Sequence, residues 1–440
     1  MNYAELIHYL DRNWTKGPQT ELATHYPFHE LRALLEARGS PERGLTVVHV
    51  TGSKGKGSVV ALTSALLRAH GLPTGAFVSP HLERVEERIL LNDRPIDPEE
   101  LASRLTDLIE TSRRLGHDPK QIWRLLLVGA LEAFRDHGLT HAAVEVGVGG
   151  RFDRTNILDG RVACITPIGL EHTQRLGSTR AAIAAQKVGI VKPGRLCVSA
   201  AQPPDVEPVL RAGVALAGGQ FVQVGQQAGY RVRALDRGGI LADFWTPHRR
   251  FEGQRVGLLG RHQAENAAVA LCAAEAVLAE TDRRLEPESV ASALAGIRWP
   301  GRLERLEADP PLVYDGAHTP ESAAALASAL AEHFPGLDWT FVVGMLTRRD
   351  AVAMLRQLAR VAERILLVPV PGFEAFDPSE IADRAAQAGL PTEPAPSVAE
   401  ALARAPARPT CVTGTLYLYG ETRRALAPAA VGKAQRTGGR

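Results

Sequence analysis

Short runs of β-branched and apolar residues alternate with longer amphipathic stretches along this chain, which is typical of an α/β fold with a doubly wound sheet. In the first part of the chain, buried strands are predicted at Thr46–Val50, Ala142–Val146 and Val162–Thr166. A helix is predicted from Gly57 to His70. Another helix begins at Asp97, because Asp97-Pro98-Glu99-Glu100 places the preferred residue types at its first positions.

The pattern changes twice further along the chain. Residues 221–251 carry short strand-like pieces and many glycines, which predicts a small β excursion, and Ala-rich helices follow near 261–280 and 286–296. Trp299–Arg302 then interrupts the helical pattern as a linker would. A second alternation follows, with strands predicted at 312–314, 340–344, 365–370 and 410–413 and helices at 320–333, 349–360 and 378–388.

These changes divide the chain into an expected domain organisation. We expect a central domain over residues 1–298, a hinge at 299–303 and a smaller Rossmann-like α/β domain at 304–427, followed by a disordered tail at 428–440. The 440 residues fit such a division, because a single core rarely grows beyond about 300 residues.

Composition and charge exclude several classes of protein. Apolar residues make up 45% and charged residues 23%, so a disordered or fibrous chain is not expected. The net charge of +2 argues against a dedicated nucleic-acid binder. No apolar run reaches the roughly 20 residues that cross a bilayer. The N-terminus shows no secretory pattern and the four cysteines show no CxxC spacing, so we expect a cytoplasmic enzyme with reduced thiols.

A Gly-rich segment follows the first predicted strand and opens a helix. In Gly52-Ser53-Lys54-Gly55-Lys56-Gly57-Ser58 the glycines let backbone N–H groups approach phosphate oxygens. Lys56 is expected on the β and γ phosphates of a nucleotide, and Ser58 toward Mg²⁺. The first loop is shorter than in the usual P-loop pattern and a glycine separates the lysine from the serine, so an ordinary βα turn is the alternative.

Three further residues stand at positions suited to chemistry near this loop. Glu145 ends a predicted strand, where a carboxylate is well placed for a metal ion. His172 follows another strand, and Lys187 lies in an amphipathic helix. Taken singly, each has an ordinary alternative: a Gly-rich turn, a structural histidine and a surface lysine. The chain contains seven lysines against 44 arginines, so each retained lysine is of interest.

Eight segments in a fixed order resemble the folylpolyglutamate synthase / dihydrofolate synthase branch of the Mur ligase superfamily. They are His49–Ser58, Ser79–Leu82, Glu145–Arg151, Gly169–His172, Gln186–Ile190, Pro300–Arg302, Asp315–His318 and Thr413–Tyr417. The resemblance extends over nearly the whole chain. It implies a P-loop-containing, Mur ligase-like central domain. It also implies an ATP-dependent ligase in which an acyl phosphate of a folate-type carboxylate is attacked by the amino group of glutamate.

The resemblance also implies roles for individual residues. Ser79, Glu145 and His172 would bind two Mg²⁺ ions, and Lys187 would be carbamylated. Only a primary amine can add CO₂ in this way, since the guanidinium of arginine stays protonated. The residues expected to contact ATP are Gly52, Gly55, Lys56, Gly57, Ser58, Asn266, Arg302 and Asp315. His318 would lie near glutamate and the phosphates, while the segments Phe152–Arg154 and Tyr26–His29 would bind the pteroate portion.

Several positions depart from the family pattern and leave the acceptor open. Lys54 and Thr319 each stand where the family usually has Asn, Glu171 where it has Asp, and Gln186 where it has Glu. None of these changes removes an expected metal ligand or the P-loop lysine. Because Thr319 lies next to the expected glutamate site, the alternative is a Mur-type amide ligase with a different acid or amino acid.

Three hypotheses therefore remain at the level of the sequence. The first is the folate ligase, acting on a tetrahydrofolate polyglutamate tail, on dihydropteroate or on both. The second is the ligase with a different substrate, and the third is a non-catalytic nucleotide-binding protein, which the set of Lys56, Glu145, His172 and Lys187 disfavours. The expected partners are small molecules, without nucleic acid or membrane, and the expected state is a monomer.

Overall fold

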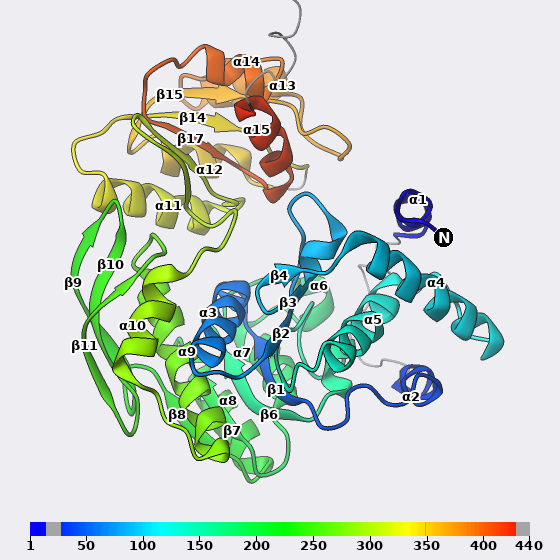
Figure 1. Cartoon of the computed structure of the whole chain (residues 1–440). Coiled ribbons are helices and arrows are strands. Elements are labelled where there is room, and N and C mark those ends of the chain that lie inside the picture. Colours follow the sequence, from blue (N-terminus) through cyan, green and yellow to red (C-terminus); the bar gives the residue numbers. More distant parts are fainter. Residues whose placement is uncertain (15–27, 348, 428–440) are drawn as a thin grey trace, which may run out of the picture. The chain divides into compact units, whose positions relative to one another are not determined.

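The computed structural model describes residues 1–14, 28–347 and 349–427 of the chain. The chain forms two compact units (Figure 1). The first unit contains residues 1–233, 241–257 and 262–297. The second contains residues 298–440 together with the short stretches 234–240 and 258–261. The expected disordered tail at 428–440 lies outside the described residues.

The first unit is organised around a sheet that has eight strands among the described residues, in the order β4-β3-β2-β5-β1-β6-β7-β8. The strands from β2 to β8 in this order run parallel, while β3 and β4 are antiparallel additions. Their bounds are β1 Thr46–Thr51, β2 Thr74–Phe77, β3 Ile89–Leu91, β4 Arg94–Pro95, β5 His141–Glu145, β6 Gly160–Ile165, β7 Leu196–Ser199 and β8 Gln220–Gln223. The carboxyl ends of β2, β5, β1 and β6 therefore meet at one edge, where ligands bind in open α/β sheets.

Helices cover both faces of this sheet. One group packs together on one side, α3 (Lys56–Ala69), α9 (His262–Leu278) and α10 (Pro287–Gly296), and α4 and α5 lie side by side elsewhere (Figure 1). The remaining helices of the unit are α1 Tyr3–Asn13, α2 Phe28–Ala37, α4 Pro98–Arg114, α5 Ile122–Asp136, α6 Thr173–Leu176, α7 Arg180–Lys187 and α8 Glu207–Leu216, with short 3-10 turns η1 Val85–Arg88, η2 Arg154–Ile157, η3 Val188–Ile190 and η4 Ala279–Thr281. The Asp97 carboxylate caps α4 by accepting from the backbone N–H groups of Glu99 and Glu100, as the sequence predicts.

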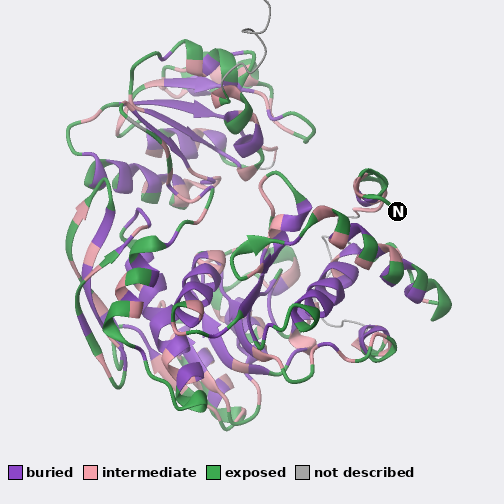
Figure 2. Ribbon diagram, in the orientation of Figure 1, coloured by how far each residue is buried: buried purple, intermediate pink, exposed green. Residues whose placement is uncertain are grey.

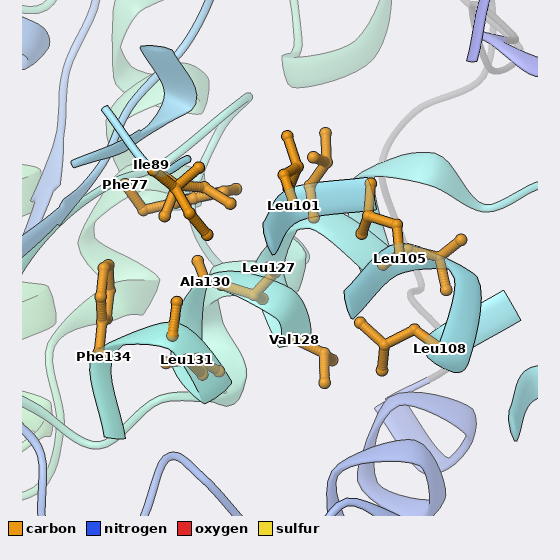
Figure 3. Packing of buried hydrophobic residues seen from close by; sticks show 14 of the residues in the cluster. Phe77, Ile89, Leu101, Leu105, Leu108, Leu127, Val128, Ala130, Leu131 and Phe134 are labelled. Atoms are coloured by element: carbon orange, nitrogen blue, oxygen red, sulfur yellow. The ribbon is translucent and has the colours of Figure 1, made fainter. Parts of the chain in front are cut away.

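A large apolar cluster holds α1, α2, α4 and α5 against one face of the sheet. Leu105 and Leu108 of α4 pack over Gly129 of α5, while Phe77 and Ile89 belong to the strands (Figure 3). The strands β1, β2, β5, β6 and β7 are buried along nearly all of their length, β4 is exposed, and other exposed residues gather on loops and outer helix faces (Figure 2). This burial explains why the strands appear in the sequence as continuous apolar runs.

The predicted β excursion is a three-stranded sheet with the order β11-β10-β9 among the described residues. The strands are β9 Gly229–Asp236, β10 Gly239–Trp245 and β11 Arg250–Val256. The stretch 234–240, which joins β9 to β10, clusters with the second unit. There the ring of His333 contacts the carbonyl oxygen of Asp236 through Nδ1 at 2.7 Å and accepts from the backbone N–H of Gly260 through Nε2 at 2.8 Å.

The second unit has a smaller sheet, with six described strands in the order β12-β13-β17-β14-β15-β16. All pairs are parallel except β12 with β13. The strands are β12 Glu304–Ala308, β13 Pro311–Tyr314, β14 Trp339–Val343, β15 Ala362–Leu367, β16 Glu393–Pro394 and β17 Thr410–Thr413, and the helices are α11 Pro320–His333, α12 Ala351–Leu358, α13 Pro378–Gln387, α14 Val398–Ala403, η5 Leu416–Leu418 and α15 Tyr419–Leu426. Its core forms around Trp339, Phe341 and Phe334.

The predicted fold class is confirmed, and the main strands and helices lie close to their expected positions. The strands β2, β3, β4, β7, β12 and β16 were not predicted from the sequence. Three of these, β3, β4 and β12, belong to antiparallel pairs at sheet edges, where the chain lacks a long buried apolar run. Among the helices that the structure describes, none is both long enough and apolar enough to cross a bilayer.

Candidate active site

The Gly-rich segment after β1 forms a tight loop that leads directly into α3. Gly52 has φ of +144°, and a Cβ at this position would overlap the hydroxyl group of Thr166. The loop is tied to the segment after β6, because Ser53 N–H donates to Pro167 O at 3.0 Å and the Ser53 hydroxyl donates to Gly169 O at 3.1 Å. The glycine is therefore required by close packing between two neighbouring strand ends.

The helix that follows begins in the geometry of a phosphate-binding turn. Gly55 is the N-cap of α3 in the left-handed conformation, with φ of +87°, and no side chain caps the helix. A Cβ on Gly55 would lie 2.5 Å from Asn266 Oδ1, so Asn266 of α9 packs against the loop. The side chain of Asn266 is oriented by a hydrogen bond, in which its Nδ2 donates to Gln263 Oε1 at 2.8 Å. Gly57 and the buried Ser58 lie in the first turn of α3. The orphan N–H groups of this turn are suited to an anion.

Two lysines converge on one carbonyl oxygen of this loop. Lys56 Nζ donates to Gly52 O at 3.1 Å, and Lys187 Nζ, at the end of α7, donates to the same oxygen at 2.8 Å. Lys187 also forms an ion pair with Glu171 Oε1 at 2.8 Å and is only 1% exposed. The structure therefore brings Lys187 to the phosphate loop, and the alternative of a surface lysine is wrong.

The charged groups in this cluster shift one another's pKa values. Burial, aided by the charge of Lys56, lowers the pKa of Lys187 to about 8, although Glu171 acts in the opposite direction. Burial raises the pKa of Glu171, but the charges of Lys56 and Lys187 outweigh it and the pKa is lowered. Lys187 thus has a substantial neutral fraction near physiological pH, which is the form in which an amine is a nucleophile.

The expected metal ligands come from three neighbouring strand ends. Glu145 is the last residue of β5, and its Oε2 accepts from the backbone N–H of Ser79, which follows β2, at 3.0 Å. His172 follows β6 in the left-handed conformation, with φ of 46°. Its side chain is exposed, and partial desolvation together with the charges of Lys56 and Lys187 lowers its pKa. A neutral imidazole is the form that binds metal ions.

These residues do not form a complete protein cage for a metal ion. Among the residues that the structure describes, no group of three or more His, Cys, Asp or Glu side chains could hold one. One carboxylate beside a serine nevertheless fits Mg²⁺, which is usually held by one or two carboxylates together with substrate phosphates and water. The donor set therefore suits a metal ion that arrives with a nucleotide.

In the second unit, the expected residues gather at the carboxyl end of β13. The Asp315 carboxylate accepts from the backbone N–H of Leu303 at 2.9 Å and of Ala317 at 2.8 Å. A Cβ on Gly316 would overlap Leu416 and would lie 3.3 Å from Arg302 Nη1, so Arg302 lies beside this turn. The structure thus brings Arg302, Asp315 and the Thr413–Tyr417 loop to the same edge of the smaller sheet.

His318 and Thr319 complete this turn. Nδ1 of His318 contacts Gly316 O at 2.8 Å, which requires the ring proton to be on Nδ1. Thr319 is the N-cap of α11, its hydroxyl accepts from the backbone N–H of Ser322, and Pro320 follows at N1. Asn and Thr are both good N-cap residues, so the departure at Thr319 has a structural explanation.

Other expected residues have simpler positions. The side chain of Lys54 is exposed on the phosphate loop, and the structure does not explain why lysine stands there. Asp153 is buried near β1, and Arg154 lies 5.3 Å from the ring of Trp123. Of the segment 26–29, Tyr26 lies outside the described residues, and Phe28 begins α2. The sequence interpretation assigned no role to Trp123 or to its neighbours Trp14 and Arg88, since none belongs to a Gly-rich or strand-end motif.

The Gly-rich loop after β1, the carboxylate at the end of β5 and the second α/β unit agree with a ligase of the Mur type, and two family profiles support this class. A family profile described as Mur ligase middle domain matches residues 124–274. A profile described as Mur ligase, glutamate ligase domain matches residues 301–413.

Relatives with known names are similar over most of the chain. Folylpolyglutamate synthase of Lacticaseibacillus casei is 31% identical over 430 residues, which cover 97% of this chain and 99% of that protein. Dihydrofolate synthase/folylpolyglutamate synthase of Mycobacterium tuberculosis is 32% identical, with 86% of this chain and 80% of that protein covered. The chain belongs to the folylpolyglutamate synthase / dihydrofolate synthase family, which confirms the resemblance found in the sequence.

Solved structures agree with this assignment. Mycobacterium tuberculosis folylpolyglutamate synthase complexed with ADP has a TM-score of 0.85 at 29% identity, covering 96% of this chain and 97% of that chain. A folylpolyglutamate synthase complex with AMPPCP and folate has a TM-score of 0.81 at 29% identity, covering 97% of this chain and 99% of that chain.

Proposed function

We propose that this protein is an ATP-dependent ligase that joins a folate-type carboxylate to L-glutamate through an acyl phosphate. One observation carries the proposal: the ends of β1, β2, β5 and β6 bring Lys56, Ser79 and Glu145 to one sheet edge, with Lys187 bound to the phosphate loop. A family member described as complexed with AMPPCP and folate supports both substrates.

The reaction transfers the γ-phosphoryl group of ATP to a carboxylate oxygen of the acceptor. The glutamate nitrogen then attacks the acyl carbon, phosphate leaves, and the amide forms after the nitrogen loses a proton. Phosphoryl transfer depends mainly on alignment and on neutralisation of charge. Lys56 and the first turn of α3 bind the phosphates, with Gly52 and Gly55 allowing close approach of the backbone. The family resemblance gives Asn266, Arg302 and Asp315 roles in nucleotide binding and gives His318 a role near glutamate.

Mg²⁺ would be held by Ser79, Glu145 and His172 together with phosphate oxygens, as two ions in the family pattern. When bound, Mg²⁺ neutralises negative charge on the phosphates. Replacing His172 with Ala should raise the Mg²⁺ concentration needed for half-maximal activity, and an unchanged Mg²⁺ dependence would argue against this ligand.

Lys187 is carbamylated in the active enzyme. Its pKa of about 8 provides the neutral amine that adds CO₂. The carbamate is an anion, so it relieves the repulsion between Lys187 and Lys56, which share the Gly52 oxygen. It also faces Glu171, whose carboxylate must then move away from its present ion pair or be bridged by a cation.

The protein acts on small molecules as a cytoplasmic monomer, without nucleic acid or membrane. The four cysteines, which are free and buried, support a reducing compartment. Residues 1–298 form the ATP-binding domain and residues 304–427 the glutamate-ligase domain, with 299–303 as the hinge. Small-angle scattering should then show compaction with an ATP analogue plus acceptor, and an unchanged radius of gyration would contradict the hinge.

The function is tested by measuring ADP release with glutamate and two acceptors in parallel, dihydropteroate and tetrahydrofolate. Release with tetrahydrofolate indicates tail extension, and release with dihydropteroate indicates synthesis of dihydrofolate. Because Thr319 caps a helix, it does not require a different amino acid, so glutamate is the expected substrate. ADP release with neither acceptor would overturn the proposal in favour of a Mur-type ligase with a different acid or amino acid.

A further inference from the structure

Strand β1 presents two polar side chains to the segment that follows Glu145. His49 and Thr51 are two residues apart, so they lie on the same face of the sheet, and both are 0% exposed. The Thr51 hydroxyl donates to Gly149 O at 2.6 Å. Nε2 of His49 lies 2.8 Å from the hydroxyl of Thr155. The strand that leads into the phosphate loop therefore holds the residues after β5 at two points.

The direction of the hydrogen bonds around Thr155 is determined by its single hydroxyl proton. The Thr155 hydroxyl donates to Asp153 Oδ1 at 2.6 Å, so its oxygen can only accept from His49. His49 must then carry its proton on Nε2, while Nδ1 is buried without a hydrogen-bond partner among the described residues. Burial also lowers the pKa of His49 to about 3, which keeps the ring neutral. The hydrogen bond that the ring makes within the described residues is therefore the one from Nε2 to Thr155.

The Asp153 carboxylate connects Thr155 to the backbone of the preceding residues. Its Oδ2 accepts from the Val148 N–H at 3.1 Å, and its Oδ1 also accepts from the Thr155 N–H at 3.0 Å. The segment closed in this way starts within three residues of Glu145, and Arg151 N–H within it donates to Gln186 O at 2.8 Å, next to Lys187. A Cβ on Gly150 would lie 2.8 Å from Lys187 O, so this segment packs directly on the end of α7.

We propose that His49 is a positioning residue for the ligation reaction. Its Nε2–H, acting through Thr155 and Asp153, fixes the 147–154 segment and thereby the spacing between Glu145, Lys187 and the phosphate loop. This role rests on the proposed function for its effect on ligation, while the hydrogen-bond relay itself does not. The simpler alternative is a histidine that only fills space in the core.

Paired variants separate these alternatives. His49→Gln keeps a donor at a similar distance from the backbone, whereas His49→Leu removes it, and Thr155→Ser and Thr155→Val form the same contrast one step along the relay. A misplaced reacting group costs up to about a hundredfold in rate, so kcat for ADP release should fall at least about tenfold in His49→Leu and Thr155→Val. His49→Gln and Thr155→Ser should recover most of this loss. The double variant His49→Leu/Thr155→Val should be little worse than either single one, since both break one network.

The control for a loss of activity caused only by lower stability is Leu210→Ala, which truncates a fully buried side chain of α8. This variant should lower the melting temperature without lowering kcat at a temperature where the protein is folded. The KM for ATP should change much less than kcat in the relay variants. Near-wild-type kcat in His49→Leu and Thr155→Val would overturn the proposal, as would an equal loss in His49→Gln and His49→Leu.

Two measurements do not depend on ligase activity. The ¹⁵N resonances of His49, assigned by their absence in His49→Gln, should report a proton on Nε2 and an unprotonated Nδ1, and the opposite tautomer would overturn the relay. Amide hydrogen exchange over residues 147–156 should be faster in His49→Leu than in His49→Gln, and equal protection would overturn it too. If the wild-type protein releases no ADP with either folate acceptor, the proposed function fails, and these two measurements still decide the relay.

Discussion

The carboxyl edges of the two sheets hold their charged groups in different ways. On the larger sheet, Lys187 is buried and shares one carbonyl oxygen with Lys56, so positive charge is concentrated and the pKa of Lys187 is lowered. On the smaller sheet, the Asp315 carboxylate is held by backbone N–H groups, and Thr319 is engaged in a helix cap. The first edge therefore concentrates charge on buried side chains, whereas on the second edge Asp315 and Thr319 use their oxygens to hold the backbone of a turn in one shape.

The largest effect is expected at Lys187. Lys187→Arg keeps the positive charge but cannot form a carbamate, so ADP release should fall by about a hundredfold or more, similar to the loss of a strong electrostatic group in other active sites. Steady-state rates and circular dichroism check the activity and the fold.

The matched control is Lys120→Arg, which changes an exposed lysine in the loop before α5. It should retain wild-type rates. A well-folded Lys187→Arg enzyme with nearly full activity would show that no carbamate is needed, and the contrast between the two edges would then lose its chemical meaning.

The next effect concerns the glycines that shape each edge. Gly52→Ala places a methyl group against Thr166, so the Kd for an ATP analogue should rise at least about tenfold, which corresponds to about 1.4 kcal/mol. Gly414→Ala on the smaller sheet would overlap the carbonyl of Gly344 and should lower the melting temperature. Calorimetry measures both quantities.

Gly296→Ala serves as the control, because a Cβ there meets nothing within 4 Å. It should leave analogue affinity unchanged and should not lower the melting temperature, since alanine is favoured over glycine in a helix. If Gly52→Ala binds the analogue with wild-type affinity, the loop after β1 is not the phosphate site.

The phosphate loop and the strand ends could be predicted from the sequence because their signals are local. Gly52 and Gly55 stand between an apolar run and an amphipathic run, and Glu145 ends an apolar run. The order of the strands in the sheet depends on contacts between distant segments, so the contact between Ser79 and Glu145 could be found only in the structure. The ion pair between Lys187 and Glu171 joins residues 16 positions apart, and nothing in their immediate neighbours indicates it.

Other parts of the site could not be predicted for a related reason. His49 lies in the middle of a buried strand, between Val48 and Val50, and its partner Thr155 is 106 residues away. Thr319 shows the opposite case. The sequence predicts the helix at 320–333, and Thr319-Pro320 carries the residue types of its first positions, but the expected glutamate site next to Thr319 suggested a role in substrate recognition as well.

The third effect is a pH dependence at Lys187 on the larger sheet: the rate of CO₂-dependent reactivation should rise about tenfold between pH 7 and pH 9. Enzyme depleted of CO₂ should regain activity on addition of bicarbonate, at a rate set by the neutral fraction of Lys187. With a pKa of about 8, that fraction is about 9% at pH 7 and rises toward completion by pH 9, roughly a tenfold increase, and changes little above it. The rate constant of reactivation, corrected for dissolved CO₂ and measured at several pH values, gives the apparent pKa. A rate that continues to rise steadily beyond pH 10 would indicate an ordinary lysine.

The smallest effect is expected at Thr319, and it tests whether the smaller sheet's edge selects the amino acid or only holds its shape. Thr319→Ala removes the oxygen that accepts from the Ser322 N–H, so the free energy of unfolding should fall by about 1 kcal/mol, whereas Thr319→Asn restores a capping oxygen and should lose little. Neither variant should change the preference for glutamate over other amino acids, because the hydroxyl is already used within the turn. Denaturant unfolding gives the stability, and ADP release with a panel of amino acids gives the preference. A change in amino-acid preference with unchanged stability would mean that Thr319 contacts the substrate, and the contrast between a reactive edge and a shape-holding edge would then be wrong at this residue.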